Sequence, residues 1–291
     1  MFSLKRYDLG EVSEVEVGWI GRKARRGRTK PPSPEQIKKW NRRQRVKKYR
    51  RLIEANFGEG DNWVCFKYRR GTRKPLKEVK SDMTRCLRMI RQIYRQAGHP
   101  FKFIYRLEYG KNAGAHIHMI CNFLPGVNNI QALQTAWLNA IRNEERTHGA
   151  VDVESLSGSG GYDKLAESIC KDPASDEGGQ MILPIDGIEE KKALVTMHAS
   201  RNLIRPEPEK QVITKATVIR LLKEGPKPSP GYAVIKGSVH VGQNPVTGMP
   251  YICWKERRLN IEKKKPEKQE KPLISKAKGI LGRLFRRLHE I

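Results

Sequence analysis

The spacing of apolar residues between residues 62 and 171 changes repeatedly from the period of a strand to that of a helix. Two-residue alternation rich in aromatic and β-branched side chains predicts strands, and recurrence at three and four residues predicts helices. The predicted strands cover residues 62–68, 102–108, 115–123 and 150–153. The predicted helices cover residues 75–97, 129–146 and 162–171.

The order of these elements, β-α-β-β-α-β-α, is that of a split βαβ arrangement. We therefore predict an α+β fold of the ferredoxin or RRM type, with one mainly antiparallel sheet and helices on one of its faces. Many unrelated functions use this arrangement, so the fold alone does not identify a function.

The pattern is weaker outside this region. Ser33, followed by Pro34 and Glu35, is typical of a helix start and predicts a basic helix through Ile53. On the other side, residues 176–260 contain a predicted helix and hairpin, which indicate an accessory extension.

The last part of the chain carries two different patterns. Residues 261–272 are of low complexity and predict disorder. From residue 274 to the end, an apolar stripe with Lys and Arg elsewhere predicts a basic amphipathic helix. Such a helix docks on its own protein, dimerises, or contacts a membrane, and the sequence favours the first two.

Charge is the feature of the composition that bears most on function. Among 291 residues, 58 Lys and Arg stand against 31 Asp and Glu, which gives a net charge of +27. Such a surface repels itself unless it meets a polyanion, so nucleic acid is the expected partner. An anionic membrane surface is the weaker alternative.

About half of this charge lies in residues 22–51, where fifteen Lys and Arg and one Glu give +14. We expect this segment to contact DNA phosphates, because charge this one-sided is costly without a polyanion. The alternative is a solvated charged helix. The candidate DNA-binding residues are Arg25, Arg26, Arg42, Arg43, Lys47 and Lys48.

Five scattered cysteines form no CxxC pair, which argues against a zinc ribbon or a disulfide framework and suits a reducing cytosol. The N-terminus lacks the apolar run of a signal peptide, and no stretch approaches the roughly 20 apolar residues of a membrane span. We therefore expect a cytoplasmic protein.

The sequence His116-Ile117-His118 is the strongest chemical signal. Residues two apart in a strand point to the same face, so both imidazoles can bind one ion. If the hairpin turns symmetrically about Asn112, Glu108 lies directly opposite His116 on that face. Two imidazoles and a carboxylate with open positions suit a divalent metal, Mn²⁺ or Mg²⁺, that also binds phosphate oxygens. The alternative is a polar exposed face without an ion.

These residues resemble a known family. HIHM, after a strand ending in Glu108, is similar to the HUH motif (His, hydrophobe, His) of rolling-circle replication initiators and relaxases, which are DNA-nicking endonucleases. The resemblance covers about residues 22–255 in the family's order. Further segments resemble a bacterial and phage branch: NFGEGD at 56–61, LAE at 165–167 with Lys171 after it, and SRNL at 200–203.

The resemblance implies an enzyme of plasmid or phage DNA replication in a bacterial host. Its partners would be single-stranded or hairpin origin DNA, with host replication proteins as further partners. A tyrosine on the helix after the sheet would attack a DNA phosphate, giving a 5′-phosphotyrosine and a free 3′-OH, while the metal polarises the phosphate. Lys171 would stabilise the phosphate or lower the pKa of the tyrosine.

The sequence departs from this family at the nucleophile. Three residues before Lys171, where the branch has tyrosine, stands Ser168. Its side chain is several ångströms shorter than that of tyrosine. Tyr162 lies about 240° away around a helix, so a packing role suits it better than that of an alternative nucleophile.

With this resemblance the chain divides into four segments. We predict a basic arm and helix (1–54), an HUH nuclease domain (55–175), the accessory extension (176–260) and a linker with a C-terminal helix (261–291). The oligomeric state is left open.

Two other functions compete with an endonuclease. One is a non-catalytic DNA-binding descendant, a repressor or origin-recognition module, which keeps the fold and the metal site but has lost its nucleophile. The other is an RNA-binding protein on a similar sheet, which would expose aromatic side chains on its central strands. Its candidate aromatics are Phe66, Tyr68, Phe103 and Tyr105. It has no need for paired histidines, so it ranks last.

Overall fold

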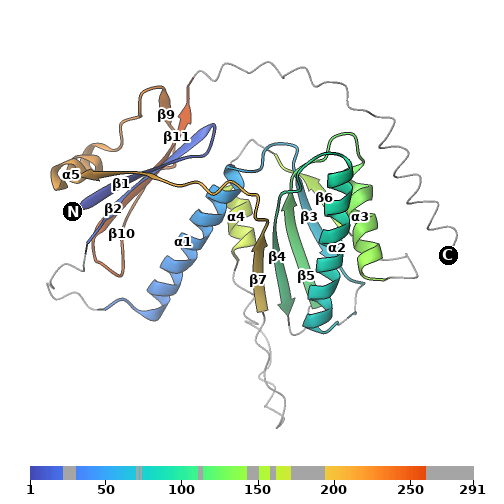
Figure 1. Ribbon diagram of the computed structural model, residues 1–291. Coiled ribbons are helices and arrows are strands. Elements are labelled where there is room, and N and C mark those ends of the chain that lie inside the picture. Colours follow the sequence, from blue (N-terminus) through green and yellow to red (C-terminus); the bar gives the residue numbers. More distant parts are fainter. Residues whose placement is uncertain are drawn as a thin grey trace, which may run out of the picture. The chain divides into compact units, whose positions relative to one another are not determined.

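The computed structural model describes residues 1–21, 31–69, 72, 74–110, 114–142, 151–157, 162–171 and 194–259. They form two compact units, each assembled from segments that are distant in the sequence (Figure 1). The described part of the first unit is residues 1–56, 162–170 and 204–259. The second unit contains the described residues between 57 and 157, with 171 and 194–203. The low-complexity segment and the C-terminal helix expected after residue 260 lie outside the described residues.

The second unit has the α+β fold that the apolar spacing predicts. Its five-stranded sheet has the order β6-β3-β5-β4-β7, and all neighbouring strands are antiparallel. The strands are β3 (Asn62–Lys67), β4 (Phe103–Gly110), β5 (Gly114–Cys121), β6 (Val151–Ser155) and β7 (Leu194–Ala199). The sequence did not predict β7, which pairs with β4 at one edge.

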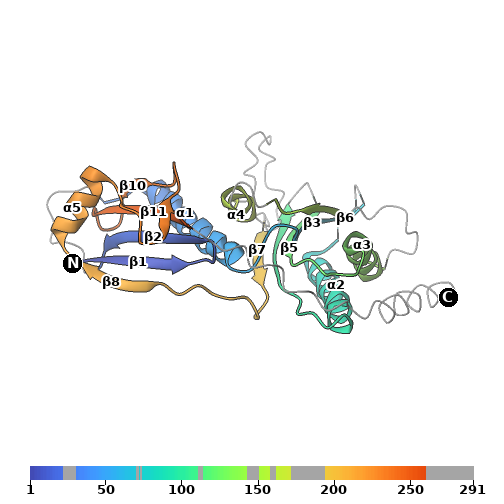
Figure 2. The same ribbon diagram turned by 90° about the horizontal axis from the view of Figure 1, so that it is seen from above.

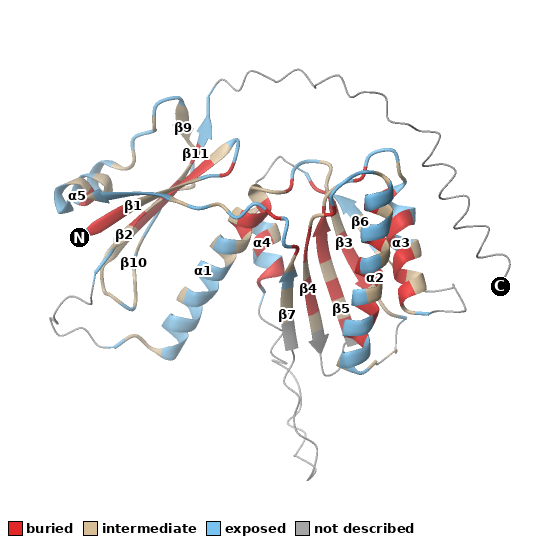
Figure 3. Ribbon diagram, viewed as in Figure 1, coloured by how far each residue is buried: buried red, intermediate tan, exposed pale blue. Residues whose placement is uncertain are grey.

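Helices α2 (Leu76–Gln96) and α3 (Asn129–Ala140) cover one face of this sheet, as expected (Figure 2). α2 carries apolar residues at three- and four-residue spacing and buries Val79, Met83 and Ile90. These side chains meet Ile117 and other alternate residues of the strands, so the core lies between the sheet and the two helices. The other sheet face is left for polar side chains (Figure 3).

The aromatic side chains of the central strands lie on the helix-covered face. Phe66 and Phe103 are buried in the core, and Tyr68 and Tyr105 pack against it. The RNA-binding alternative required exposed aromatics on these strands, and the burial of both phenylalanines does not meet that requirement.

The first unit is built on a six-stranded antiparallel sheet of order β10-β11-β2-β1-β8, with β9 paired to β11. The strands are β1 (Phe2–Asp8), β2 (Val12–Trp19), β8 (Glu209–Ile213), β9 (Tyr232–Val234), β10 (His240–Gln243) and β11 (Pro250–Arg258). Helix α5 (Lys215–Glu224) packs on the apolar face through Val218, which meets Val15 and Trp254. None of the described helices is long and apolar enough to cross a bilayer.

Helix α1 (Pro34–Glu54) begins where the sequence predicts. The Ser33 hydroxyl accepts a hydrogen bond from the Gln36 amide, and the Gln36 side chain accepts one from the Ser33 amide, which completes a capping box. The last turn of α1 buries Leu52 and Ile53. Short helix α4 (Asp163–Ile169) contacts α1 within the same unit.

Ion pairs attach α1 to the polar face of the first sheet. Glu14 and Glu16 of β2 point to this face because Val15 and Val17 occupy the other. The Arg51 guanidinium lies 2.7 Å from the Glu14 carboxylate and 2.8 Å from that of Glu16, and Arg50 also pairs with Glu14. Burial by itself would raise the pKa of Glu14, but hydrogen bonds and charge from these arginines outweigh it and lower the pKa to about 2.

The arrangement of the units differs from four consecutive segments. Residues 1–19 form two strands of a sheet rather than the start of a basic arm, because they pair with β8 and β11 near the other end of the described chain. Residues 194–203 belong to the second unit instead of an accessory extension, and α4 belongs to the first. All five cysteines are free and buried.

The Glu14 pairs should make the first unit sensitive to acid. The folded-state pKa lies below the ordinary value of 4.5, so this stabilisation is present above pH 4.5 and is lost as the pH falls toward about 2. Glu14→Gln should lower the free energy of unfolding at pH 7 by about 3 kcal/mol and flatten the acid limb of a denaturation series. Glu11→Gln, at an exposed position of the same hairpin, is the control. An unchanged acid limb in Glu14→Gln would contradict the assignment.

Candidate functional site

The β4–β5 hairpin sets the geometry of the histidine pair. Glu108 lies directly opposite His116, which confirms the register predicted from a turn centred on Asn112. Arg106 lies opposite His118 in the same pairing. On the other side of β5, Cys65 of β3 lies opposite His118 and Lys67 opposite His116. Directly paired residues share a face, so all six side chains belong to the polar face of the sheet.

Alternation along the strands separates this face from the core. Ile117, between the two histidines, is fully buried under α2 and α3, as is Leu107 next to Glu108. Both histidines are half-buried. The sequence places the imidazoles on the uncovered face because their apolar neighbours are needed on the covered one.

His118 has a nitrogen suited to a further ligand. Its Nδ1 is buried and, among the described residues, has no hydrogen-bond partner. The ring stacks on the indole of Trp63, with 5.4 Å between centroids and 12° between planes. Burial lowers the pKa of His118, and the Glu108 carboxylate opposes this only in part. The imidazole is therefore favoured in its neutral form, which is the form that binds metals.

Glu108 is engaged by a residue that the sequence analysis missed. The buried Arg106 guanidinium donates to the Glu108 carboxylate and also to the backbone carbonyl of Lys171. This arginine therefore brings Lys171 to the histidine-bearing face within the second unit. The available signal was its position two residues before Glu108, which puts both side chains on one face of β4.

The donor set fits a divalent ion in kind and in register. Two imidazoles and a carboxylate are ligands that such ions accept, and the unpartnered Nδ1 of His118 has the chemistry of a vacant donor. Among the described residues, no three His, Cys, Asp or Glu side chains stand close enough together to hold an ion, and Glu108 is paired with Arg106 instead. The metal therefore remains a prediction, with Glu108, His116 and His118 as its ligands.

Helix α4 carries the nucleophile position. Ala166 and Ile169 are buried, while Lys164 and Ser168 are exposed, as expected for a polar face at these positions. The helix is shorter than the predicted 162–171, since Cys170 is its C-cap. Lys171 therefore lies beyond the helix on which the sequence analysis placed it.

Tyr162 caps the other end of α4. It is the N-cap residue, half-buried, with the helix beginning at Asp163. The Asp163 carboxylate lies 3.0 Å from Arg50 and 2.6 Å from Lys255, which ties this end of α4 to α1 and β11. Ser168 and Tyr162 belong to the first unit, and the histidines and Lys171 to the second.

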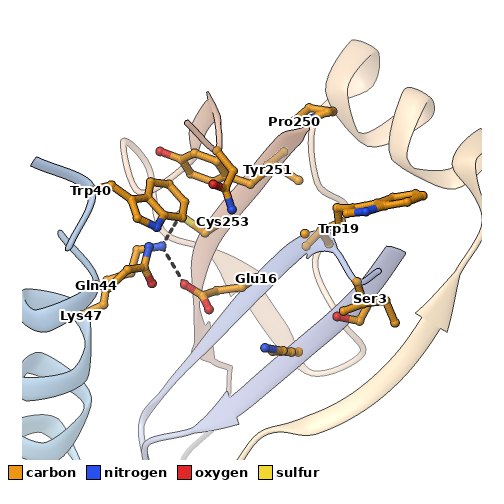
Figure 4. Close-up of a pocket in the computed structure, with 15 residues that line it drawn as sticks. Ser3, Glu16, Trp19, Trp40, Gln44, Lys47, Pro250, Tyr251 and Cys253 are labelled. Carbon is orange, nitrogen blue, oxygen red and sulfur yellow. Dashed lines mark hydrogen bonds and ion pairs between the residues drawn. The ribbon is translucent and has the colours of Figure 1, made fainter. Parts of the chain in front are cut away.

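The candidate DNA-binding cations differ in their surroundings. Arg42, Arg43 and Lys48 are exposed on α1. Lys47 points to the sheet, where its Nζ lies 2.6 Å from Glu16 and 3.4 Å from the Cys253 sulfur (Figure 4). Lys47 therefore holds α1 to its own unit, and its assignment to DNA is corrected. Arg25 and Arg26 lie outside the described residues.

Comparison with known proteins bears on the second unit and α4. Residues 61–172, which are 112 of the 291 residues, match the family described as replication-associated protein, ORF2 type. No curated protein and no solved structure matches the chain. The matched segment begins at the start of β3 and ends just after Lys171, so it contains the histidine pair and the nucleophile position. This match supports a replication-initiator family and a role in DNA replication.

Proposed function

We propose that this protein is a replication initiator of the HUH type, an endonuclease scaffold that binds single-stranded or hairpin origin DNA and has Ser168 at the nucleophile position. The observation that carries the proposal is the pairing of Glu108 with His116 on the face that also bears His118. The family match over residues 61–172 supports the same function class.

The proposed chemistry is transesterification. A phenolic oxygen attacks the scissile phosphorus, the bond from phosphorus to the 3′ oxygen breaks, and that oxygen takes up a proton. A divalent ion held by Glu108, His116 and His118 would supply Lewis-acid polarisation of the phosphate. Arg106 orients Glu108 and fixes the backbone of Lys171, whose ammonium would be set to neutralise phosphate charge.

Serine suits this role poorly. Its hydroxyl is several ångströms nearer the backbone than a tyrosine oxygen, and an unactivated aliphatic hydroxyl is a weaker nucleophile than a phenol at neutral pH. We therefore propose that the chain as written binds origin DNA without cleaving it efficiently. In that form it acts as the non-catalytic DNA-binding module, and the enzyme is the scaffold from which it derives.

Restoring the phenol tests this function. Ser168→Tyr, incubated with labelled single-stranded origin DNA and Mn²⁺, should form a covalent protein–DNA adduct at least about a hundredfold faster than the parent. Adding His116→Ala and His118→Ala to that variant should remove the adduct. Ser168→Phe, which supplies the ring without the hydroxyl, is the matched control.

The same assay decides between the two tyrosine positions. Tyr162→Phe in the Ser168→Tyr background should leave the gained adduct largely intact. Cleavage by the parent that Tyr162→Phe abolishes would contradict the assignment of Ser168 and move the nucleophile to Tyr162.

The exposed cations of α1 should contribute sequence-independent affinity for DNA. Replacing Arg42, Arg43 and Lys48 together with Ala removes three phosphate contacts, so the slope of log K against log salt for single-stranded DNA should fall by about 2. Deleting the whole helix would not isolate this effect, because Arg50 and Arg51 are ion-paired within the unit.

The matched control removes the same charge elsewhere on the first unit. Lys215, Arg220 and Lys223 are exposed on α5, and their triple Ala variant should keep the parental slope. Equal slopes for the two triple variants would show that α1 faces away from DNA.

A further inference from the structure

The segment at residues 200–203, SRNL, fastens the end of β7 to the start of β4. The Ser200 hydroxyl accepts a hydrogen bond from the Phe103 amide at 3.1 Å, and the Ser200 amide donates to the Phe103 carbonyl at 2.9 Å. The Asn202 side chain donates to the Phe101 carbonyl at 3.1 Å. The serine and asparagine are therefore structural, and they leave the exposed Arg201 between them without such a role.

Arg201 lines a groove of about 890 Å³ between this segment, α2 and β4. Four rings from β4, β7 and the residues before β4 form a continuous stack along it. Successive centroids lie 5.0 Å apart from Phe101 to Phe103, 6.0 Å from Phe103 to Tyr105 and 4.8 Å from Tyr105 to His198. The phenylalanines are buried, Tyr105 is half-buried and His198 is exposed, so the stack ends at the surface.

Cations without acidic partners accompany this stack. Arg91 and Arg95 of α2 line the groove with Arg201, and all three are exposed. Within the part of the chain that the structure describes, no Asp or Glu lines the groove and none forms an ion pair with these arginines. The Arg91 guanidinium lies over the Phe103 ring, 5.4 Å from its centroid. Stacked arginines keep their donors available for phosphate.

We propose that this groove binds single-stranded DNA, with an unpaired base on the Tyr105–His198 stack and backbone phosphates on Arg91, Arg95 and Arg201. The ring stack favours a single strand over a duplex, whose bases already stack on each other. It also favours DNA over an acidic peptide, which offers charge without rings. Only the identity of the ligand rests on the proposed function.

The groove is a second site, separate from the histidine pair. Tyr105 and His198 are paired across β4 and β7 on the face that carries α2, since Tyr105 alternates with Arg106 on β4. His116 and His118 lie on the opposite face of the same sheet. A strand held here is bound without touching the metal ligands, so binding in the groove requires no metal.

Anisotropy of a labelled oligo(dT) bound to the full chain, measured without divalent metal over a salt series, tests the arginines. The Arg91→Ala/Arg95→Ala variant should lower affinity about tenfold and reduce the salt slope by about 1.4, the value for two lost phosphate contacts on a single strand. Lys77→Ala/Arg88→Ala is the matched control: both residues are exposed on α2, and neither lines the groove.

An abasic strand of equal length tests the stacking. The parent should bind oligo(dT) more tightly than the abasic strand, and His198→Ala should reduce that preference. Arginine and control variants that bind alike, no preference for bases, or equal competition by duplex DNA would each overturn the proposal. Adduct formation by Ser168→Tyr is a separate readout, so loss of the groove and loss of the proposed function are distinguishable.

Discussion

The antiparallel pairing of β4 with β5 is the constraint on which the second unit depends. Leu107 meets Ile117 in the core, and Glu108 meets His116 on the opposite face. A slip of one residue would bury the histidines and expose the isoleucine, so packing against α2 and α3 fixes the register. The burial of apolar residues on one face thereby determines where the chemistry of the other face lies.

Cations serve two different purposes in this basic chain. Arg50 and Arg51 are ion-paired to Glu14 and bind α1 to its sheet, and the depressed pKa of that carboxyl reflects their combined hydrogen bonds and charge. Arg91 and Arg201 line an aromatic groove without acidic partners among the described residues. Net charge therefore predicts a polyanionic partner, whereas the surroundings of each side chain decide whether it can meet one.

Apolar spacing predicted the elements of the second unit and the position of the histidines, because those signals are local. It missed β1 and β2, whose partners β8 and β11 lie some two hundred residues away along the chain. It also assigned Lys47 to DNA, since a sequence does not show that Glu16 lies beneath it. Arg106 escaped for a related reason: its contact with the Lys171 carbonyl joins segments that only the fold brings together.

Paramagnetic broadening by Mn²⁺ tests the central claim, that the polar face of the second sheet is a divalent-ion site, most directly. The sequence has seven histidines, whose ring signals can be assigned by single substitution to Ala. Substoichiometric Mn²⁺ should broaden the signals of His116 and His118 first and leave the other five sharp, and Glu108→Gln should weaken that selectivity. Uniform broadening of all seven, or signals of His116 and His118 that stay sharp, would contradict the account.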